Sequence, residues 1–358
     1  MVLHTKASLI FVSVLLWTLI YIFVVSSLFA AYRFYQEGYL TYQYITRNKS
    51  YYLSNRETLE KNEHGFLWIE KAQSKTPSNP LSSSTLGYID IKSYPYIINE
   101  TNKCKVNSPF LIFLIATIAS EIENRKIIRR TFGNEVLKKG TSIMCLFLLG
   151  KSSQQDPIAL LEESEKYHDI IQKDFQDTYT NLTFKTLMGI EWVSNYCPMA
   201  KYVMKTDSDM FVNTERLLDL LGPDQPQKQN YFTGQLMFNH RPHRNQNSKW
   251  YMPHSLYPGE FYPSFCSGTG YVFSGDVAPK ILRSSLKVKY VYLEDVFVGI
   301  CLDREGIKIT HPPTSYLFNN FRVPFSPCVY NSIITSHYMT PNDLLNFWII
   351  VQQNKWTC

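Results

Sequence analysis

Two aspartates that flank a single serine are the clearest candidates for chemistry in this chain. Asp207 and Asp209 follow an apolar, β-prone run, Lys201 to Met204, so we expect them at the carboxyl end of a strand. Ligands bind at that edge of an open α/β sheet, and carboxylate oxygens suit Mg²⁺ or Mn²⁺, which are often held together with substrate phosphates. The pattern predicts a site for a divalent metal and a diphosphate. A solvated loop or a helix N-cap is the alternative.

Two adjacent carboxylates further along are candidates for proton transfer. Glu294 and Asp295 lie within an apolar stretch, Leu293 to Gly299, where an unpaired carboxylate is costly to bury. Partial burial also raises the pKa of a carboxyl group, which suits a general base. The pair therefore predicts a catalytic base. The alternative is a helix N-terminus, where the helix dipole favours acids.

Two smaller features complete the set of candidates. The segment Phe265-Cys-Ser-Gly-Thr-Gly-Tyr carries Gly268 and Gly270, and glycine allows the backbone to approach a ligand closely. A plain turn or bulge before a strand is the alternative for this segment. His337 lies in a β-like run, where it is either a third metal ligand or a structural residue.

Apolar strands alternate with amphipathic helices between residues 109 and 221, and these elements have to position the candidate groups. Asp156-Pro-Ile, for example, places an N-cap aspartate before a proline at the first helical position. Such alternation predicts an α/β domain with a mostly parallel central sheet covered by helices on both faces. We expect strands at 109–117, 142–149, 169–175, 201–207 and 232–234, and helices at 121–131, from 156, at 181–195 and at 213–221.

The N-terminal region predicts a membrane anchor followed by a linker. Residues 7–31 contain no charged side chain, and about 20 apolar residues suffice to span a bilayer. The stretch is longer than the core of a signal peptide and has no clear cleavage site. We therefore expect a cytoplasmic tail at 1–6 and an uncleaved transmembrane signal anchor at 7–31. Polar, breaker-rich sequence predicts a lumenal stem at 32–103, and a catalytic domain follows at 104–358.

Sequons and cysteines favour an oxidising compartment for the region after the anchor. Three Asn-x-Ser/Thr sequons, at Asn48, Asn99 and Asn181, follow the apolar segment. The chain has seven cysteines, so at least one is unpaired, and we expect it to be Cys145 because that residue lies in an apolar strand. The others allow three bridges whose pairing stays open: Cys104, Cys197, Cys266, Cys301, Cys328 and Cys358.

The net charge of +6 is spread along the chain without a long run of lysine or arginine. Nucleic-acid-binding proteins concentrate their basic residues on one face, so we expect no nucleic-acid partner. A mildly basic chain is compatible with an anionic small substrate.

Taken in order, these segments resemble the Golgi β-1,3-galactosyltransferase family, which comprises inverting enzymes with a GT-A-like fold and one N-terminal membrane span. The resemblance covers about residues 104–358. One departure is Phe132, where the family usually has tryptophan. The segments that carry the resemblance are Arg125-Lys-Ile-Ile-Arg-Arg-Thr-Phe-Gly, Phe147-Leu-Leu-Gly, Asp169-Ile-Ile-Gln-Lys-Asp-Phe, Asn181-Leu-Thr-Phe-Lys-Thr, Gly189-Ile-Glu-Trp-Val, Lys205-Thr-Asp-Ser-Asp-Met-Phe-Val-Asn, Phe265-Cys-Ser-Gly-Thr-Gly-Tyr, Glu294-Asp-Val and His337.

The resemblance implies Mn²⁺ as cofactor, UDP-galactose as donor substrate and a role for each candidate residue. Asp209 and His337 would bind the metal. Asp295 would be the catalytic base, with Glu294 positioning the acceptor or tuning that base. By analogy with the related fringe enzymes, Cys197 and Cys266 would pair. Residues near the nucleotide or the sugars would be Thr117, Arg125, Arg129, Asp207, Ser208, Ser267, Gly268, Thr269 and Gly270.

The implied activity is transfer of galactose in β1,3 linkage to a terminal GlcNAc or GalNAc of a glycoprotein or glycolipid glycan. The implied location is the Golgi membrane, with one type II span and a lumenal catalytic domain. The alternatives are a β-1,3-N-acetylglucosaminyltransferase of the same family, a non-catalytic Golgi glycan-binding protein and a metal-dependent phosphohydrolase. The sequence has too few clustered metal ligands for a phosphohydrolase. The acceptor, the oligomeric state and the occupancy of the sequons stay open.

Overall fold

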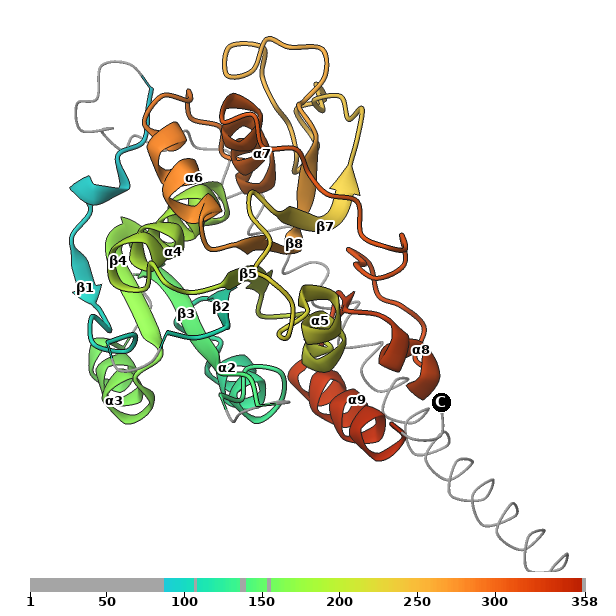
Figure 1. Ribbon diagram of the computed structural model, residues 1–358. Helices are drawn as coiled ribbons and strands as arrows, with labels where there is room; N and C mark the ends of the chain where they lie inside the picture. Colours follow the sequence, from blue (N-terminus) through green and yellow to red (C-terminus); the bar gives the residue numbers. More distant parts are fainter. Residues whose placement is uncertain (1–86, 106–107, 136–139, 153–155, 356–358) are drawn as a thin grey trace, which may run out of the picture. The chain divides into compact units, whose positions relative to one another are not determined.

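A computed structural model describes residues 87–105, 108–135, 140–152 and 156–355 (Figure 1). The predicted tail, the predicted membrane span at 7–31 and most of the predicted stem lie outside these residues. No helix in the described part of the chain is long and apolar enough to cross a membrane.

The described residues build a mixed seven-stranded sheet in the order β1-β4-β3-β2-β5-β8-β7. The four central strands are parallel to one another, whereas β1, β8 and β7 run antiparallel to their neighbours. The expected α/β fold with a mostly parallel central sheet is therefore present. The strands are β1 (Tyr96–Ile98), β2 (Leu111–Ala116), β3 (Ile143–Lys151), β4 (Ile170–Gln176), β5 (Tyr202–Asp207), β7 (Phe232–Met237) and β8 (Phe265–Ser274).

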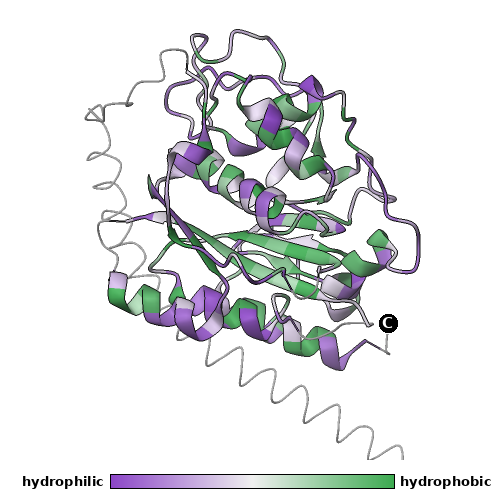
Figure 2. Ribbon diagram, turned by 60° about the vertical axis from the view of Figure 1, so that its left-hand side comes forward, coloured by the Kyte–Doolittle hydropathy of each residue, from purple (hydrophilic) through white to green (hydrophobic). Residues whose placement is uncertain are grey.

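Two layers of helices cover the two faces of this sheet (Figures 1 and 2). β2 is buried throughout, and its side chains alternate between two apolar cores: Ile112 and Leu114 face one, and Leu111, Phe113 and Ile115 face the other. This alternation explains why the strand reads as a continuous apolar run. The helices are α2 (Ile122–Arg130), α3 (Pro157–Tyr167), α4 (Leu182–Tyr196), α5 (Thr214–Leu221), α6 (Val277–Ser285), α7 (Glu294–Arg304), α8 (Pro327–Ser332) and α9 (Pro341–Gln353).

The chain reverses its direction across the sheet between β2 and β5. From β2 it proceeds outward through β3 to β4, and α4 then returns it to β5 on the other side of β2. Ala116 and Asp207, the last residues of β2 and β5, are register partners. A crevice therefore opens at the carboxyl ends of these two strands, which is the usual ligand position in such sheets.

Local sequence signals start the helices where they were expected. The Asp156 carboxylate accepts hydrogen bonds from the backbone N–H groups of Ile158 and Ala159, and Pro157 occupies the first position of α3. These contacts satisfy backbone donors that have no partner within the helix. Asn213 caps α5 in the same way through the N–H of Arg216.

The folded unit includes residues that were predicted to belong to the stem. β1 pairs with β4 as the edge strand of the sheet, and Tyr88 forms a bridge with Lys289. The domain therefore takes in chain before residue 104. The short segment η1 (Ile91–Ser93) also lies in this region, with Ile91 buried in the core.

The cysteines pair differently from the expectation based on the fringe enzymes. Cys104 is bonded to Cys197, with their Cα atoms 5.4 Å apart. Cys266 is free and buried within β8, so the expected Cys197–Cys266 bridge is wrong. Cys145 is free, as predicted, and Cys301 is free as well.

Candidate active site

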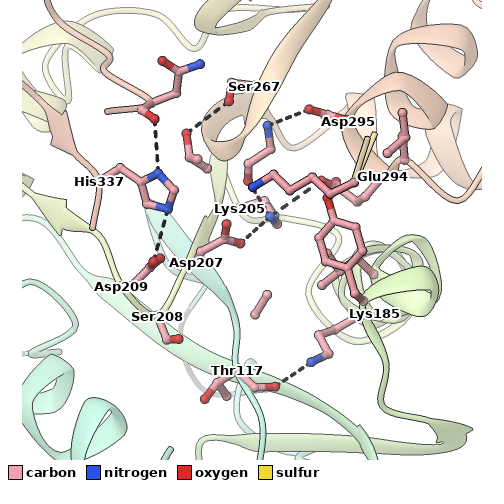
Figure 3. Close-up of a pocket in the computed structure, with 18 of the residues that line it drawn as sticks. Thr117, Lys185, Lys205, Asp207, Ser208, Asp209, Ser267, Glu294, Asp295 and His337 are labelled. Carbon is pink, nitrogen blue, oxygen red and sulfur yellow. Dashed lines mark hydrogen bonds and ion pairs between the residues drawn. The ribbon is translucent and has the colours of Figure 1, made fainter. Parts of the chain in front are cut away.

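A pocket of about 490 Å³ opens at the carboxyl ends of β2 and β5 (Figure 3). Its walls come from segments that are far apart in the sequence: the end of β2, η2 (Tyr179–Asn181), the end of β5, the glycine segment of β8 and the start of α7. Most of the predicted site residues line it, namely Thr117, Asp207, Ser208, Asp209, Ser267, Gly268, Thr269, Glu294, Asp295 and His337.

One wall of the pocket carries three potential metal ligands. One ligand atom from each of Asp207, Asp209 and His337 lies within 4.8 Å of the others. Nε2 of His337 is 3.2 Å from Oδ2 of Asp209, and its Nδ1 is 3.2 Å from the carbonyl oxygen of Asn320. The Asn320 contact orients the imidazole and leaves Nε2 toward the carboxylates.

The short sheet formed by β6 (Phe211–Val212) and β9 (Thr335–Ser336) brings His337 to Asp209. The N–H of Met339 also donates to the carbonyl of Asp209 at 2.8 Å. Burial disfavours the charged imidazole, but the Asp209 carboxylate outweighs it and raises the pKa of His337. Two carboxylates and an imidazole are a donor set that fits Mn²⁺ or Mg²⁺.

Beside this triad, Glu121 organises the end of β2 and the Asp-Ser-Asp turn. Its Oε2 accepts hydrogen bonds from the hydroxyls of Thr117 (2.9 Å) and Ser208 (2.7 Å). Lys185 supports the same loop from α4, since it donates to the Thr117 carbonyl at 2.6 Å and pairs with Asp177 at 2.7 Å. Neither Glu121 nor Lys185 was predicted as a site residue.

The opposite wall carries the carboxylates that were predicted for proton transfer. Glu294 and Asp295 occupy the first turn of α7, so the pair lies at a helix N-terminus and also lines the pocket. Burial raises the pKa of Asp295, although the N–H groups of Val296 (2.9 Å) and Gly268 (3.2 Å) donate to its carboxylate and oppose the shift. Burial also raises the pKa of Glu294. A raised pKa suits a general base.

The glycine segment is part of β8 and not a turn before a strand. A Cβ on Gly268 would lie 3.0 Å from Oε2 of Glu294, so glycine lets β8 approach this carboxylate without displacing it. Ser267 and Thr269 line the pocket on either side of it. Gly270 is not among the lining residues, and a Cβ there would meet Met204 and Thr206 of β5.

Lys205 lies between the two walls (Figure 3) and was missed as a site residue. This buried lysine donates to Oδ1 of Asp207 at 2.7 Å and lies 3.6 Å from Oε2 of Glu294. Its presence in an apolar strand was the available signal, because lysine is almost never fully buried without a partner. The partner on Glu294 could not be read from the sequence.

The structure does not bring Arg125 and Arg129 into the pocket. Arg125 is fully buried and donates to the carboxylate of Glu163 (2.7 and 2.8 Å) and to the carbonyl of Ile118 (2.7 Å). Arg129 forms a two-pronged contact with Asp169, at 2.7 and 2.8 Å. In this arrangement Arg125 anchors the loop after β2, and neither arginine is among the residues that line the pocket.

Comparison with known proteins agrees with this architecture. The galactosyltransferase family model matches residues 123–313. β-1,3-Galactosyltransferase 2 of Homo sapiens is 51% identical over 306 residues, which cover 84% of this chain and 72% of that protein. β-1,3-Galactosyltransferase 1 of Mus musculus is 48% identical over 271 residues, which cover 75% of this chain and 81% of that protein.

Neither a solved structure nor the choice of a particular family member extends this comparison. The solved structure of the bifunctional glycosyltransferase WbbM aligns with a TM-score of 0.38 and 13% identity over 68% of this chain and 50% of that chain, which is too weak a likeness to carry an argument. The sequence motifs also look most like the type 5 member of the family, and that finer assignment stays a prediction. The family model and the two relatives establish that the chain belongs to the β-1,3-galactosyltransferase family, and hence that it is a hexosyltransferase.

Proposed function

We propose that this chain transfers galactose from UDP-galactose to O3 of a terminal β-linked GlcNAc, with inversion at the anomeric carbon and with Mn²⁺ as cofactor. One observation carries the proposal: a single pocket holds both a metal-type donor set, Asp207, Asp209 and His337, and a half-buried carboxylate with a raised pKa, Asp295.

The metal-type donor set would receive the donor substrate. Asp209 and His337 would hold Mn²⁺ with Asp207 beside it, and the bound ion would supply Lewis-acid stabilisation of negative charge on a leaving diphosphate. Thr117 and Ser208 present hydroxyls that Glu121 orients on the same wall. These two residues would contact the nucleotide.

Asp295 would act as the base on the acceptor. Each carboxylate oxygen accepts one backbone N–H bond, from Val296 or from Gly268, and retains a lone pair for the acceptor hydroxyl. Asp295 takes the proton of the acceptor hydroxyl while the oxygen of that hydroxyl forms a bond to the anomeric carbon. The bond from that carbon to the UDP oxygen breaks on the opposite face, so one displacement inverts α to β.

The location that we propose rests on the sequence alone. Residues 7–31 would anchor the protein in the Golgi membrane as a single type II span, and the catalytic domain would lie in the lumen, where glycoprotein and glycolipid acceptors are present. Cell-surface labelling and protease protection of a tagged full-length chain would test this orientation.

The function is tested with the full-length chain purified in detergent from a eukaryotic host. It is offered UDP-Gal, UDP-GlcNAc or UDP-GalNAc with Mn²⁺ and an acceptor that ends in β-GlcNAc, and the product linkage is read by NMR. We expect β1,3-linked galactose from UDP-Gal alone, and no product with EDTA. Transfer from UDP-GlcNAc would instead identify an N-acetylglucosaminyltransferase. Metal-dependent UDP binding without transfer, also to a GalNAc acceptor, would contradict the catalytic proposal.

A further inference from the structure

We propose that Lys205 is a positioning residue that holds the donor carboxylate Asp207 and the base Asp295 in one fixed geometry. This inference rests on the proposed galactosyl transfer and adds a group that spans the two halves of its site.

Lys205 contacts both walls of the pocket from the middle of β5. On the wall with the metal-type donor set, its ammonium group donates a hydrogen bond to Oδ1 of Asp207 at 2.7 Å. On the opposite wall, the same group donates to the carbonyl oxygen of Gly268 at 2.5 Å and lies 3.6 Å from Oε2 of Glu294. A buried lysine has three N–H donors, and these three oxygens surround it.

The contact with Gly268 extends the influence of Lys205 to the base. Gly268 accepts from Lys205 through its carbonyl and donates to Oδ2 of Asp295 through its N–H at 3.2 Å. The peptide backbone at this one residue therefore connects the ammonium group to Asp295. A shift of the Gly268 carbonyl would move the N–H that orients the base.

The antiparallel pairing of β5 with β8 provides a second connection. Lys205 is the register partner of Tyr271, and the hydroxyl of Tyr271 donates to Oε1 of Glu294 at 2.6 Å. Glu294 is thus held at one oxygen by the tyrosine and approached at the other by the lysine. This arrangement fixes the residue that precedes Asp295 at the start of α7.

The balance of charges in the pocket also supports a role for Lys205. Asp207, Glu294 and Asp295 bring three carboxylates into one largely buried region, and an unpaired buried carboxylate is costly. Of the other lysines that line the described pocket, Lys185 is occupied by Asp177 and the Thr117 carbonyl, and Lys249 is exposed against the ring of Trp250. Among these pocket lysines, Lys205 is the one that pairs with Asp207 and approaches Glu294.

The test compares Lys205→Met with the wild type in the full-length chain. Because Lys205 reaches both walls, we expect the affinity for UDP with Mn²⁺ and the kcat for galactose transfer to fall together, each by about 10- to 100-fold, as for other residues that orient a site from behind. Calorimetry measures UDP affinity and initial rates give kcat and KM. Unchanged UDP affinity and unchanged kcat in this variant would overturn the proposal.

Lys173→Met is the matched control for the loss of a buried lysine. Lys173 is equally buried, pairs with Glu191 at 2.5 Å and lies on β4 away from the pocket. We expect this control to lower the melting temperature while the folded enzyme keeps its kcat and its UDP affinity. An equal loss of both in the control would overturn the assignment, because burial alone would then explain the result.

Chemical rescue separates a positioning role from a packing role. Lys205→Ala leaves space for a small amine, and we expect propylammonium to restore part of the turnover, whereas 1-propanol restores none. Equal rescue by the alcohol, or none by the amine, would contradict a role for the positive charge.

A second variant covers the case in which Lys205→Met does not fold. Lys205→Met combined with Glu294→Gln removes one of the carboxylates that would be left unbalanced, and UDP binding is compared with that of Glu294→Gln alone. We expect weaker binding in the double variant, and equal binding would overturn the proposal. The UDP-binding measurement does not depend on sugar transfer. Absence of transfer by the wild type would contradict the proposed function, and the comparison of UDP binding between the two variants would still test the role of Lys205.

Discussion

The backbone N–H of Gly268 donates a hydrogen bond of 3.2 Å to Oδ2 of Asp295. The strand β8 therefore orients the carboxylate that we assign as the base, although the base itself lies on α7. A Cβ at this position would lie 3.0 Å from Oε2 of Glu294, so any residue other than glycine would require the Glu294 carboxylate to move by a few tenths of an ångström.

Gly268→Ala tests that contact. The added methyl group would crowd Oε2 of Glu294, which would have to move by a few tenths of an ångström, and a misplacement of about 1 Å can cost about 100-fold in rate. We expect kcat to fall by less than about 100-fold while UDP affinity changes little, because Glu294 and Asp295 lie on the wall opposite the metal-type donor set. Steady-state kinetics together with calorimetry measure both quantities. A normal kcat would show that Asp295 does not depend on this approach.

Asp295→Asn keeps the shape of the side chain and removes its basicity. We expect kcat to fall by about 10²- to 10⁴-fold, the usual contribution of a general base. UDP binding with Mn²⁺ should persist, because the metal-type donor set is on the other wall. If UDP affinity fell as much as turnover, Asp295 would be part of the donor site and not the base.

Asp209→Ala tests the metal-type donor set. Its side chain is 41% exposed, so we expect a small effect on stability, as for exposed charged groups in general. Mn²⁺-dependent UDP affinity should fall by at least about tenfold, the lower bound seen when groups that merely support a metal ligand are lost. Titration of UDP with and without Mn²⁺ checks this, and an unchanged metal dependence would remove Asp209 from the set.

Glu294→Gln should raise stability at neutral pH. Burial raises the pKa of Glu294 in the folded protein, so the folded state binds this proton more tightly than the unfolded state. The free energy of unfolding of the wild type therefore falls as the pH rises through that raised pKa. Glutamine cannot ionise and avoids this loss.

The stabilisation by Glu294→Gln should vanish in acid, below the pKa of an ordinary glutamate, where both states of the wild type are protonated. Thermal melts at several pH values measure it, and roughly 2–4 °C of melting temperature corresponds to each kcal/mol for a domain of this size. A variant that is less stable than the wild type at pH 7 would show that the Lys205 and Tyr271 contacts need the charge.

The Cys104–Cys197 bridge should contribute to stability. It links residues 93 positions apart, and native disulfides typically add about 2–4 kcal/mol. We expect Cys104→Ala with Cys197→Ala to lower the free energy of unfolding by about this amount, as measured by denaturant titration. Cys266→Ala should leave the bridge intact in a non-reducing peptide map. A peptide that joins Cys197 to Cys266 in the map of the wild-type protein would instead contradict the Cys104–Cys197 bridge.

The parallel half of the fold could be predicted because its signals are local. Strands expected at 142–149 and 169–175 correspond to β3 and β4, and the helix expected at 181–195 corresponds to α4. β3 is buried on both faces up to Gly150, so it reads as one apolar run. β4 is apolar only at Ile170, Ile171 and Phe175. The antiparallel edge was harder: β1 lies in a segment rich in polar residues, and its place in the sheet depends on pairing with β4.

The site was predictable where a motif ends an element and unpredictable where it depends on pairing across the sheet. Asp207, Asp209 and Asp295 lie at a strand end or a helix start, and their carboxylates line the pocket. Lys205 acquires its role through the register of β5 with β8, which no local pattern contains. Arg125 was expected near the nucleotide, but burial against Glu163 turns its guanidinium into the fold.

The bridge from Cys104 to Cys197 encloses β2, β3 and β4, together with the helices α2, α3 and α4, in one covalent loop. A single proteolytic cut anywhere inside this loop would leave two fragments that stay joined until the bridge is reduced. Such a nicked molecule would migrate as one species on a non-reducing gel. The intact band would hide a break in the segment that supplies Thr117 to the pocket.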